Sequence, residues 1–392
     1  MLVFSIDLGH MSHRVHYLIR FLKEENIDTR IFDISFRHET QSFLGFLRNI
    51  LSFPPKVSVS SKRTIQFPSL PTLGYDRGNF KAFMHFTYSI LEFVLAGIIA
   101  QPLDYNVIVA TDPISALVAV AATKSSAIFV YEDLDYFEDL QPGKTRSTFI
   151  SLLAKLGLKR ADLVVSVSEP LLRRARFANS NCLLVPNGAD LRCFPRSQEL
   201  CRDQSIVYVG SMDEWAGLEL VIRSFPLLKK KIPTVRMKIV GEGKEKRTLE
   251  ALVRLLSLQD SVFFTGRLPY RKMAELLTNS SVGLAMFKPG NAAAFASPLK
   301  LFDYMAAGVP IIATDIGDIG RIVRESDSGF AIEWDIDEFV KAAESLLTKQ
   351  DRWLKFHKNG LQYVEKYDWD ILFDGWLRAV KHRVKMLTQV SE

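Results

Sequence analysis

Short apolar runs that alternate with longer helical patterns are the feature that most constrains the fold of this chain. In the first half, the runs that predict strands are Leu2–Ile6, Thr29–Asp33, Val107–Ala110, Ala127–Tyr131, Leu163–Val167 and Cys182–Val185. In the second half, they are Ser205–Val209, Arg236–Val240, Val262–Thr265, Val282–Met286 and Ile311–Ala313. Strands that alternate with helices form parallel sheets built from βαβ units. We therefore predict an α/β protein with two Rossmann-like domains that face each other across a central cleft.

A stretch rich in turn-forming residues separates the two series of strands. It begins with Pro186–Asp190, continues through Phe194 and Pro195, and stays polar up to Gln204. Turn formers of this kind mark connections between folded segments, so we predict one domain at residues 1–190 and a second at 191–368. The last helical pattern starts at Trp369 and is amphipathic, which predicts that residues 369–392 cross back and pack on the first domain.

Composition excludes several classes of protein. Apolar residues make up 48% and charged residues 24% of the chain, as in soluble proteins with well-buried cores. The formal net charge of +6 suits anionic partners, but no Lys/Arg block interleaved with aromatics predicts binding to nucleic acid. The three cysteines lack metal-ligand spacing, and the N-terminus lacks the basic region of a secretory signal. We therefore expect a cytoplasmic protein with reduced thiols.

Two aromatic-rich segments leave two interpretations open. They span residues 43–51 and 80–100, and charged residues interrupt the second, so it is too polar for a membrane span. Core packing is one interpretation of both segments. The alternative is a surface that binds the cytoplasmic face of a membrane, with help from nearby basic residues. These are Arg48, Lys56, Lys62 and Arg63.

The glycine motifs of several enzyme classes are incomplete. The turn after the first predicted strand has one glycine, Gly9, and Gly241-Glu242-Gly243 lacks the third glycine of a dinucleotide-binding fingerprint. The P-loop and the Gly-x-Ser-x-Gly motif are also missing. These gaps count against dehydrogenases, nucleoside triphosphatases and hydrolases.

Small residues nevertheless follow several predicted strands, at the carboxyl ends where open α/β sheets bind ligands. We expect these loops to bind an anion. The candidates are Gly9, His10 and Thr111-Asp112-Pro113 in the first domain and Gly210, Ser211, Gly241, Gly243, Gly266 and Arg267 in the second. Because His10, His13 and His16 recur every three residues, metal binding is an alternative. A helical face with His10 near a ligand is the preferred interpretation.

The segment from Ser297 to Asp315 carries the strongest signal. It reads SPLKLFDYMAAGVPIIATD. Pro298 suits a first helical turn, the predicted helix runs to about Ala307, and Gly308 suits a left-handed cap. The segment therefore predicts a helix whose N-terminus follows directly on a loop.

The start of this predicted helix suits a phosphate group. A helix N-terminus has free N–H groups and a partial positive charge, and Lys300 adds a full charge. Asp303, one turn further on, can accept hydrogen bonds from a ribose diol. The predicted donor-binding residues of this segment are Ser297, Pro298, Leu299, Lys300 and Asp303.

The same segment resembles the nucleotide-sugar signature of GT-B glycosyltransferases, in particular the retaining family numbered four, which usually has a glutamate at the position of Asp303. Further segments resemble the family in the right order, from about Asp162 to Trp369. They are DLVVSVSE at 162–169, VPNGAD at 185–190, YVGS at 208–211, KIVGEG at 238–243 and FTGRLPY at 264–270. The resemblance implies a hexosyltransferase that moves a sugar, with retention, from a nucleotide-diphosphate sugar to a glycan or lipid-linked acceptor. We expect no metal and no other cofactor.

An acidic cluster of Glu132, Asp133 and Asp135 follows a predicted buried strand. The family's frequent histidine–aspartate pair appears here as Leu134-Asp135. Clustered carboxylates can position an acceptor hydroxyl or stabilise an oxocarbenium-like transition state. Asp135 and Asp133, with His10, are therefore the predicted catalytic residues. The alternative is acids that a helix N-terminus favours through its dipole.

Two departures from the family pattern keep other functions open. The family usually has an acid several residues before the position of Asp303, and Ala292–Phe295 contains none. It also usually has a lysine in the loop after the first strand of the second domain, where this chain has Ala216. A non-catalytic partner subunit is therefore one alternative. A nucleotide-sugar epimerase on the same paired fold is another, because both chemistries use a similar donor site.

Overall fold

The computed structural model describes residues 1–6, 13–34, 64–66, 105–123, 126–139, 144–194 and 204–390. The chain divides into two compact units. The first unit comprises Met1–Val185 together with Phe373–Glu392, and the second comprises Pro186–Leu372. The polypeptide therefore leaves the first unit after Val185 and returns to it near the C-terminus.

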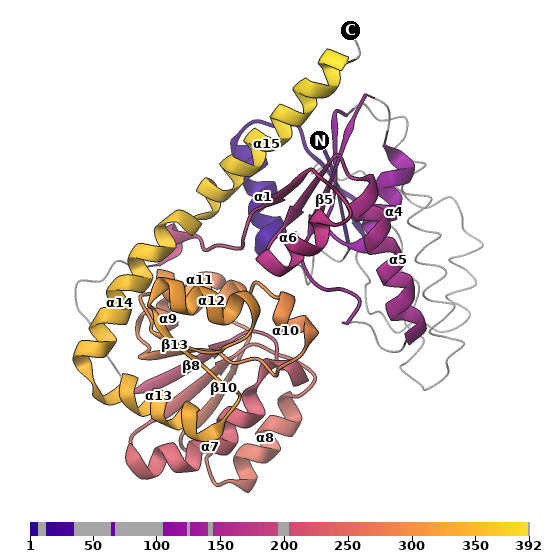
Figure 1. The fold of residues 1–392 in the computed structure, drawn as a ribbon. Helices are drawn as coiled ribbons and strands as arrows, with labels where there is room; N and C mark the ends of the chain where they lie inside the picture. Colours follow the sequence, from indigo (N-terminus) through magenta and orange to yellow (C-terminus); the bar gives the residue numbers. More distant parts are fainter. Residues whose placement is uncertain are drawn as a thin grey trace. The chain divides into compact units, whose positions relative to one another are not determined.

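The first unit is a parallel sheet with helices packed on it (Figure 1). Its described strands lie in the order β3-β2-β1-β4-β5-β6-β7. The strands are β1 Leu2–Ile6, β2 Arg30–Ile34, β3 Thr64–Gln66, β4 Val107–Ala110, β5 Ile128–Asp133, β6 Leu163–Ser166 and β7 Cys182–Leu184. The described helices are α1 His13–Glu24, α4 Pro113–Ala122, α5 Lys144–Arg160, α6 Glu169–Arg176 and, from Phe373 onward, α15 Trp369–Val390.

The central strands of this sheet are apolar without alternation. Every residue of β4, β5 and β6 is buried, as expected of parallel strands that helices cover on both faces. Helix α4 starts where its sequence dictates, because the Asp112 carboxylate accepts the N–H groups of Ile114 and Ser115, each at 2.9 Å. Pro113 fits the first turn, where no N–H is needed.

Helix α15 is anchored to the first unit by residues from Phe373 onward. The Phe373 ring lies 5.9 Å from that of Phe21 in α1. The Trp376 indole N–H donates to Glu132 of β5 at 2.6 Å, and Arg14 of α1 pairs with the same carboxylate at 3.0 Å. Arg14 and Glu132 are each 1% exposed, so this pair is a buried junction of three elements. Figure 1 shows α15 running beside α1.

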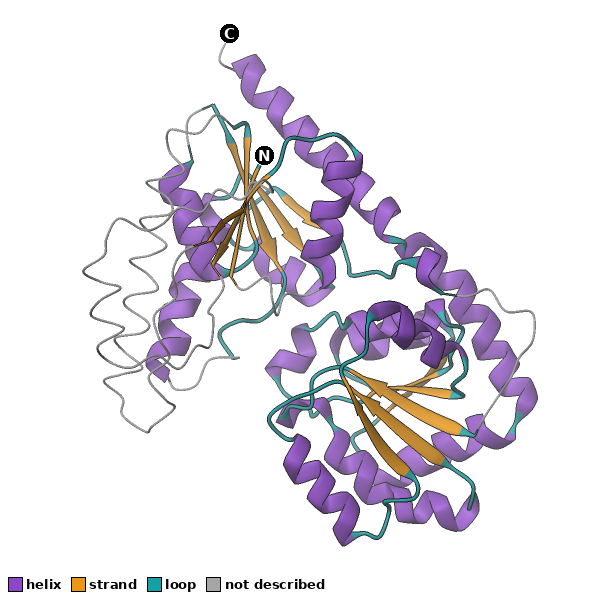
Figure 2. Ribbon diagram, turned by 180° about the vertical axis from the view of Figure 1, so that it is seen from behind, coloured by secondary structure: helices purple, strands orange, loops and turns teal. Residues whose placement is uncertain are grey.

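The second unit is also a parallel sheet between helices (Figure 2). Its described strands lie in the order β10-β9-β8-β11-β12-β13. They are β8 Ser205–Val209, β9 Arg236–Val240, β10 Val262–Gly266, β11 Val282–Ala285, β12 Ile311–Thr314 and β13 Gly329–Ile332. The helices are α7 Leu218–Lys231, α8 Lys246–Leu255, α9 Tyr270–Thr278, α10 Asn291–Phe295, α11 Leu299–Ala306, α12 Gly317–Ser326, α13 Ile336–Thr348 and α14 Gln350–Val364. Short 3-10 turns are η1 Leu191–Cys193, η2 Glu214–Ala216 and η3 Glu365–Tyr367.

Two apolar clusters cover the two faces of the second sheet. Ile206 and Tyr208 of β8 join the cluster that includes residues of α7, α8 and α13. Val207, between them in sequence, joins the cluster that includes residues of α9, α11 and α12. This division follows from the two-residue period of a strand, which turns successive side chains to opposite faces.

The strand order of each sheet reverses at one point. In the first unit this is between β1 and β4, and in the second it is between β8 and β11. The connections from the two strands at such a point run in opposite directions, which leaves a crevice at their carboxyl ends where open α/β sheets bind ligands. In the second unit, the loops after β8 and β11 flank this point.

The α/β fold class predicted from the sequence is confirmed by the two parallel sheets. The cleft expected between the domains stays a prediction. The sequence pattern did not predict β3 or β13, which are short and lie at sheet edges. Helix α11 begins at Leu299 and not at Pro298, whose extended ψ of 127° makes it the N-cap residue. The C-terminal helix begins at the expected Trp369 and ends at Val390.

Candidate functional site

Backbone hydrogen bonds join the loops that follow β8, β9 and β10 in the second unit. The Gly210 N–H donates to the Val240 carbonyl at 3.0 Å, and the Gly241 N–H donates to the Gly266 carbonyl at 2.9 Å. These three strands are neighbours in the parallel sheet, so their carboxyl ends meet at one edge. The predicted glycine loops are therefore brought together.

Glycine is required where these loops approach most closely. Gly241 has a φ of +132°, and a Cβ there would lie 2.0 Å from the Gly210 carbonyl oxygen. A Cβ on Gly243 would lie 2.4 Å from the backbone nitrogen of Met212. Both contacts are with backbone atoms, so a side chain would force the loops apart. Gly241 and Gly243 thus shape the edge of the sheet, whatever ligand binds there.

Lys300 of α11 points its ammonium group at the same edge. The residue is 8% exposed, and its Nζ lies 4.0 Å from the ring centroid of Tyr208 and 5.2 Å from that of Phe287. A Cβ on Gly210 would lie 2.8 Å from this nitrogen. The ammonium has no hydrogen-bond partner among the described residues, and burial lowers its pKa to about 7. The aromatic rings stabilise a cation only partly, so an anion at this point would stabilise the ammonium further.

Tyr304 fixes the position of α11 at the point where the strand order reverses. Its hydroxyl accepts the Val209 N–H at 3.0 Å and donates to the Leu284 carbonyl at 3.1 Å. It therefore links the last residue of β8 to β11. A Cβ on Gly283 would lie 2.6 Å from the Tyr304 ring, which explains why glycine stands in this strand.

Asp303 lies one turn further along α11, next to α9. Its carboxylate accepts a hydrogen bond of 2.6 Å from the Tyr270 hydroxyl. Burial raises the Asp303 pKa to about 7, and the hydrogen bond from Tyr270 opposes that shift. Tyr270 belongs to the FTGRLPY segment, so two segments that the sequence singled out meet at this carboxylate.

The start of α11 is held by a residue from the boundary segment. The Asn187 side-chain amide donates to the Ser297 carbonyl at 2.6 Å. The Ser297 hydroxyl is buried without a hydrogen-bond partner among the described residues. Pro298 and Leu299 follow as N-cap and first helical residue, and the cap makes no side-chain hydrogen bond. In this first turn the Leu301 N–H donates to the Pro298 carbonyl at 3.2 Å, which leaves the N–H groups of Leu299 and Lys300 without an intrahelical partner.

The two remaining donor candidates of the second unit are more peripheral. Arg267 is exposed and directly follows β10. Ser211 is half-buried, and its carbonyl accepts a hydrogen bond of 2.6 Å from the Tyr208 hydroxyl. Neither side chain contributes to the surroundings of the Lys300 ammonium.

Two aromatic residues that the sequence did not predict, Trp215 and Phe287, lie beside this site. Trp215 and Phe287 stack with ring centroids 5.5 Å apart and planes 16° apart. The Trp215 carbonyl also accepts the Lys288 N–H at 2.9 Å, which joins the loops after β8 and β11. The signal in the sequence was the position of Phe287 just beyond a strand. Nothing in the sequence paired it with Trp215 or Lys300.

In the first unit, the predicted acidic cluster divides into three separate environments. The catalytic role assigned to Asp133 and Asp135 stays a prediction, and Glu132 lies apart from Asp133, paired with Arg14 and Trp376. The reason is the strand period, because successive side chains of β5 point to opposite faces. Asp133 is fully buried, and Arg174 of α6 donates to one of its oxygens at 2.7 Å. Asp135, beyond the strand, is half-buried.

The pKa values of these two aspartates rise for the same reason. Burial raises the Asp133 pKa to about 7, although the nearby Arg174 cation opposes the shift. Burial raises the Asp135 pKa to about 6, although a hydrogen bond of 3.0 Å from the Tyr136 N–H opposes it. Asp135 combines a raised pKa with access to solvent, which suits a group that meets a substrate.

Several predicted features fall outside the described residues. These are Gly9, His10 and the aromatic-rich segments at 43–51 and 80–100. His16 is exposed on α1. Within the described ranges, no three His, Cys, Asp or Glu side chains gather as metal ligands would. In the same ranges, no helix is both long and apolar enough to cross a bilayer.

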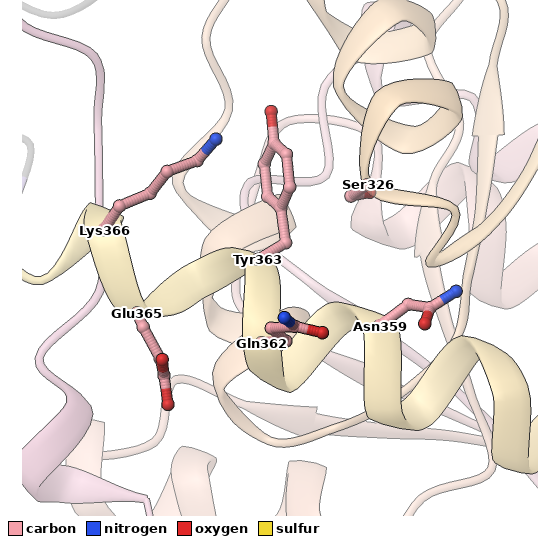
Figure 3. Close-up of a pocket in the computed structure, with 6 residues that line it drawn as sticks. All are labelled: Ser326, Asn359, Gln362, Tyr363, Glu365 and Lys366. Carbon is pink, nitrogen blue, oxygen red and sulfur yellow. The ribbon is translucent and has the colours of Figure 1, made fainter.

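A cavity of about 430 Å³ lies elsewhere on the second unit (Figure 3). Its lining comes from the end of α12, the last turns of α14 and η3. The lining residues are Ser326, Asn359, Gln362, Tyr363, Glu365 and Lys366. None of the predicted site residues belongs to it, and Figure 3 shows the labelled side chains of α14 and η3 together with Ser326. The cavity is therefore not part of the site around Lys300 and Asp303.

Comparison with known proteins identifies the domain that carries Lys300 and Asp303. Residues 195–363 match the family model described as glycosyl transferases group 1. The second unit carries a group 1 glycosyltransferase domain. The chain is also 25% identical, over 243 residues, to an uncharacterized glycosyltransferase from Haemophilus influenzae. That match covers 59% of this chain and 65% of the relative, which is just under two thirds of its length.

Solved glycosyltransferase structures extend the likeness to both units. Sucrose-phosphate synthase from Thermosynechococcus elongatus superposes with a TM-score of 0.69 at 17% identity, covering 99% of this chain and 98% of the other. The Anabaena protein HepE, crystallised with UDP and glucose, gives a TM-score of 0.67 at 14% identity, covering 97% and 100%. At these identities the likeness shows the fold, which is the GT-B fold that the sequence segments predicted.

Proposed function

We propose that this group 1 domain binds the diphosphate of a nucleotide sugar at Lys300 and that the chain transfers the sugar, with retention, to a glycan or lipid-linked acceptor. The observation that carries the proposal is the buried Lys300 ammonium, which has no hydrogen-bond partner in the part of the chain that the structure describes and lies beside the Gly210 loop. A buried ion is stable only when it is paired or when its pKa shifts. A diphosphate oxygen in this place supplies the missing partner.

The neighbouring groups suit the rest of a nucleotide. The free N–H groups at the start of α11 favour negative charge, as does the positive end of the helix dipole. Asp303 and Tyr270 offer an acceptor and a hydroxyl for a ribose diol, 2.6 Å apart. Charge that develops on the departing diphosphate would be stabilised by Lys300 and the helix N-terminus, so no metal is needed in this proposal.

Asp135 is the proposed catalytic carboxylate. It would position the acceptor hydroxyl or stabilise the oxocarbenium-like transition state. Asp133 is less suited to that role because Arg174 occupies one of its oxygens and the residue has no exposed surface.

A contact between the first unit and an anionic membrane, as a route to a lipid-linked acceptor, remains part of the proposal. Vesicle flotation at low salt tests it.

A non-catalytic partner subunit is the second candidate. Ala216, where the family usually has a lysine, is fully buried and contributes no charge. Such a subunit would bind a nucleotide sugar without turnover. The epimerase alternative predicts conversion of the sugar with no acceptor present.

A thermal-shift screen followed by a turnover assay separates these functions. UDP and UDP-glucose are suitable first probes, because the similar Anabaena protein was crystallised with UDP and glucose. A ligand at a hundred times its Kd stabilises the native state by about 2.7 kcal/mol, which a shift in Tm detects. Binding of a nucleotide sugar and transfer of its sugar to an added glycan or lipid-linked acceptor support the proposal. If no nucleotide sugar in a panel of bases shifts the Tm, the donor assignment is wrong.

A further inference from the structure

Arg174 of α6 links both ends of the loop that carries Asp135. One arm of its guanidinium donates to Asp133, the last residue of β5, at 2.7 Å. The other arm donates to both oxygens of Glu138, at 3.0 and 3.2 Å. One side chain therefore closes residues 133–138 into a loop through charge-assisted hydrogen bonds, which are the strong ones.

The residues between these two anchors are held as well. The Arg174 guanidinium lies 5.1 Å from the ring centroid of Tyr136. Leu134 packs against Val15 and Ile19 of α1. The Tyr136 N–H donates to the Asp135 carboxylate at 3.0 Å. The Asp135 carboxylate thus lies in a short span that is fixed on both sides.

We propose that Arg174 is a positioning residue for sugar transfer, which fixes the Asp133–Glu138 loop so that Asp135 is held for the reaction. The proposal rests on the proposed function, because it takes Asp135 to be the catalytic carboxylate. It assigns Asp133 and Glu138 to the anchoring of Arg174 and not to substrate. Arginine suits this task because its planar fork reaches two carboxylates at once, whereas lysine carries a point charge.

The physical reason is that catalysis depends on placement within a fraction of an ångström. A catalytic group displaced by about 1 Å loses on the order of a hundredfold in rate. Without the guanidinium, Asp133 and Glu138 would repel each other, and the loop would lose its two fixed ends. Donor binding in the second unit does not use these residues and should be unaffected.

A double-mutant cycle between Arg174 and Asp135 tests the proposal. Arg174→Ala should lower kcat by about ten- to a hundredfold, a loss expected of misplaced catalytic groups, and leave the Kd for the nucleotide sugar within about twofold. In an Asp135→Asn background, Arg174→Ala should lower kcat little further, because residues that act as a unit are not additive. Arg174→Lys should recover part of the lost kcat through one of the two ion pairs.

Two variants on the same helix serve as controls. Arg173→Ala removes an exposed cation from the neighbouring position and should leave kcat unchanged. Ala175→Gly weakens α6 at a buried position without touching the loop, so it reports what loss of helix stability alone does to kcat. Equal losses of kcat in Arg174→Ala and Ala175→Gly at matched Tm would overturn the proposal, as would additive effects in the cycle. Should Arg174→Ala not fold, Arg174→Gln takes its place in the cycle.

Hydrogen–deuterium exchange gives a readout that needs no activity. The amides of residues 134–137 should exchange faster in Arg174→Ala than in Arg173→Ala, because loss of the anchors favours local opening. Unchanged exchange there would overturn the proposal even if kcat falls. If the parent chain binds donors but transfers no sugar, the proposed function fails, and the exchange result still decides whether Arg174 fixes the loop.

Discussion

Binding of a diphosphate to Lys300 should be accompanied by uptake of a proton. Burial lowers the Lys300 pKa from 10.5 to about 7, and none of the residues described in the structure forms a hydrogen bond with the ammonium. An anion at hydrogen-bond distance favours the charged form and moves the pKa back toward its ordinary value. At pH 8 the free site would be roughly 10% protonated and the occupied site almost fully protonated, so binding takes up about 0.9 proton. At pH 6 the free site is already about 90% protonated, and the uptake falls to about 0.1.

Titration calorimetry in buffers of different ionisation enthalpy measures this uptake directly. UDP is a suitable ligand at pH 8, because its phosphates are then fully ionised and bring no proton of their own. Lys300→Met removes the ammonium and keeps the apolar stem, so its titration should show no uptake and binding about ten- to a hundredfold weaker, since a hydrogen bond to a charged group is worth about 1.5–3 kcal/mol. Lys246→Met, which removes a cation of α8 that pairs with Glu242, is the matched control.

The same substitution should change the pH dependence of stability. The folded pKa of Lys300 is below its unfolded value, so between about pH 7 and 10.5 the unfolded chain binds more protons and stability rises with pH. One pKa unit is worth about 1.4 kcal/mol, which puts the full effect at roughly 5 kcal/mol. Lys300→Met should therefore stabilise the unliganded protein most at pH 7 and below, with a gain that shrinks toward pH 10. Urea unfolding at three pH values checks this. In the calorimetric titrations, equal proton uptake by parent and Lys300→Met at pH 8, or no uptake by the parent, would refute the reasoning about Lys300.

Three further predictions concern the other site residues. Asp303→Asn should weaken binding of UDP by about ten- to a hundredfold, since a charged hydrogen bond is lost, but leave binding of pyrophosphate, which has no ribose, unchanged in calorimetry. Gly241→Ala should lower the free energy of unfolding, measured in urea, by more than about 2 kcal/mol, because its φ of +132° and the contact with Gly210 both oppose a side chain. The control Gly290→Ala, with open space around its Cβ, should leave the free energy of unfolding nearly unchanged. Asp135→Asn should lower kcat far more than it changes the calorimetric Kd of the nucleotide sugar, because a carboxylate at the reacting centre acts on the transition state; a parent-like kcat would remove it from the mechanism.

The sequence predicts elements well where a continuous apolar run meets a turn former. Ser205–Val209 and Arg236–Val240 have the same bounds in the prediction and in the structure, because glycine directly follows each strand. The sequence did not predict β13, because its four residues begin with glycine and are mostly half-buried at a sheet edge. Neither β13 nor β3 is long enough for a periodic pattern to emerge.

The surroundings of the site could not be predicted, because contacts between distant residues determine them. The sequence proposes Lys300 as a phosphate ligand, but it does not say that the ammonium is buried against Tyr208 and Phe287. It groups Glu132 with Asp133, although Trp376, 244 residues away, donates to Glu132 and Arg174, 41 residues away, donates to Asp133. A local pattern shows which charges are close in sequence, and tertiary packing decides which of them act together.

Lys300 and Asp303 both lower the stability of the unliganded second unit near neutral pH. Lys300 is penalised while it is charged, at and below about pH 7, as derived above. Asp303 has a folded pKa raised to about 7 from 3.8, so between these values the folded state binds more protons and stability falls as pH rises. A fold selected only for stability would have replaced both with apolar side chains, as buried ionisable groups without full partners are costly. Their presence one helical turn apart, at the point where the strand order reverses, is therefore explained by a ligand that carries both an anion for Lys300 and hydroxyl donors for Asp303, which is the chemistry of a nucleoside diphosphate.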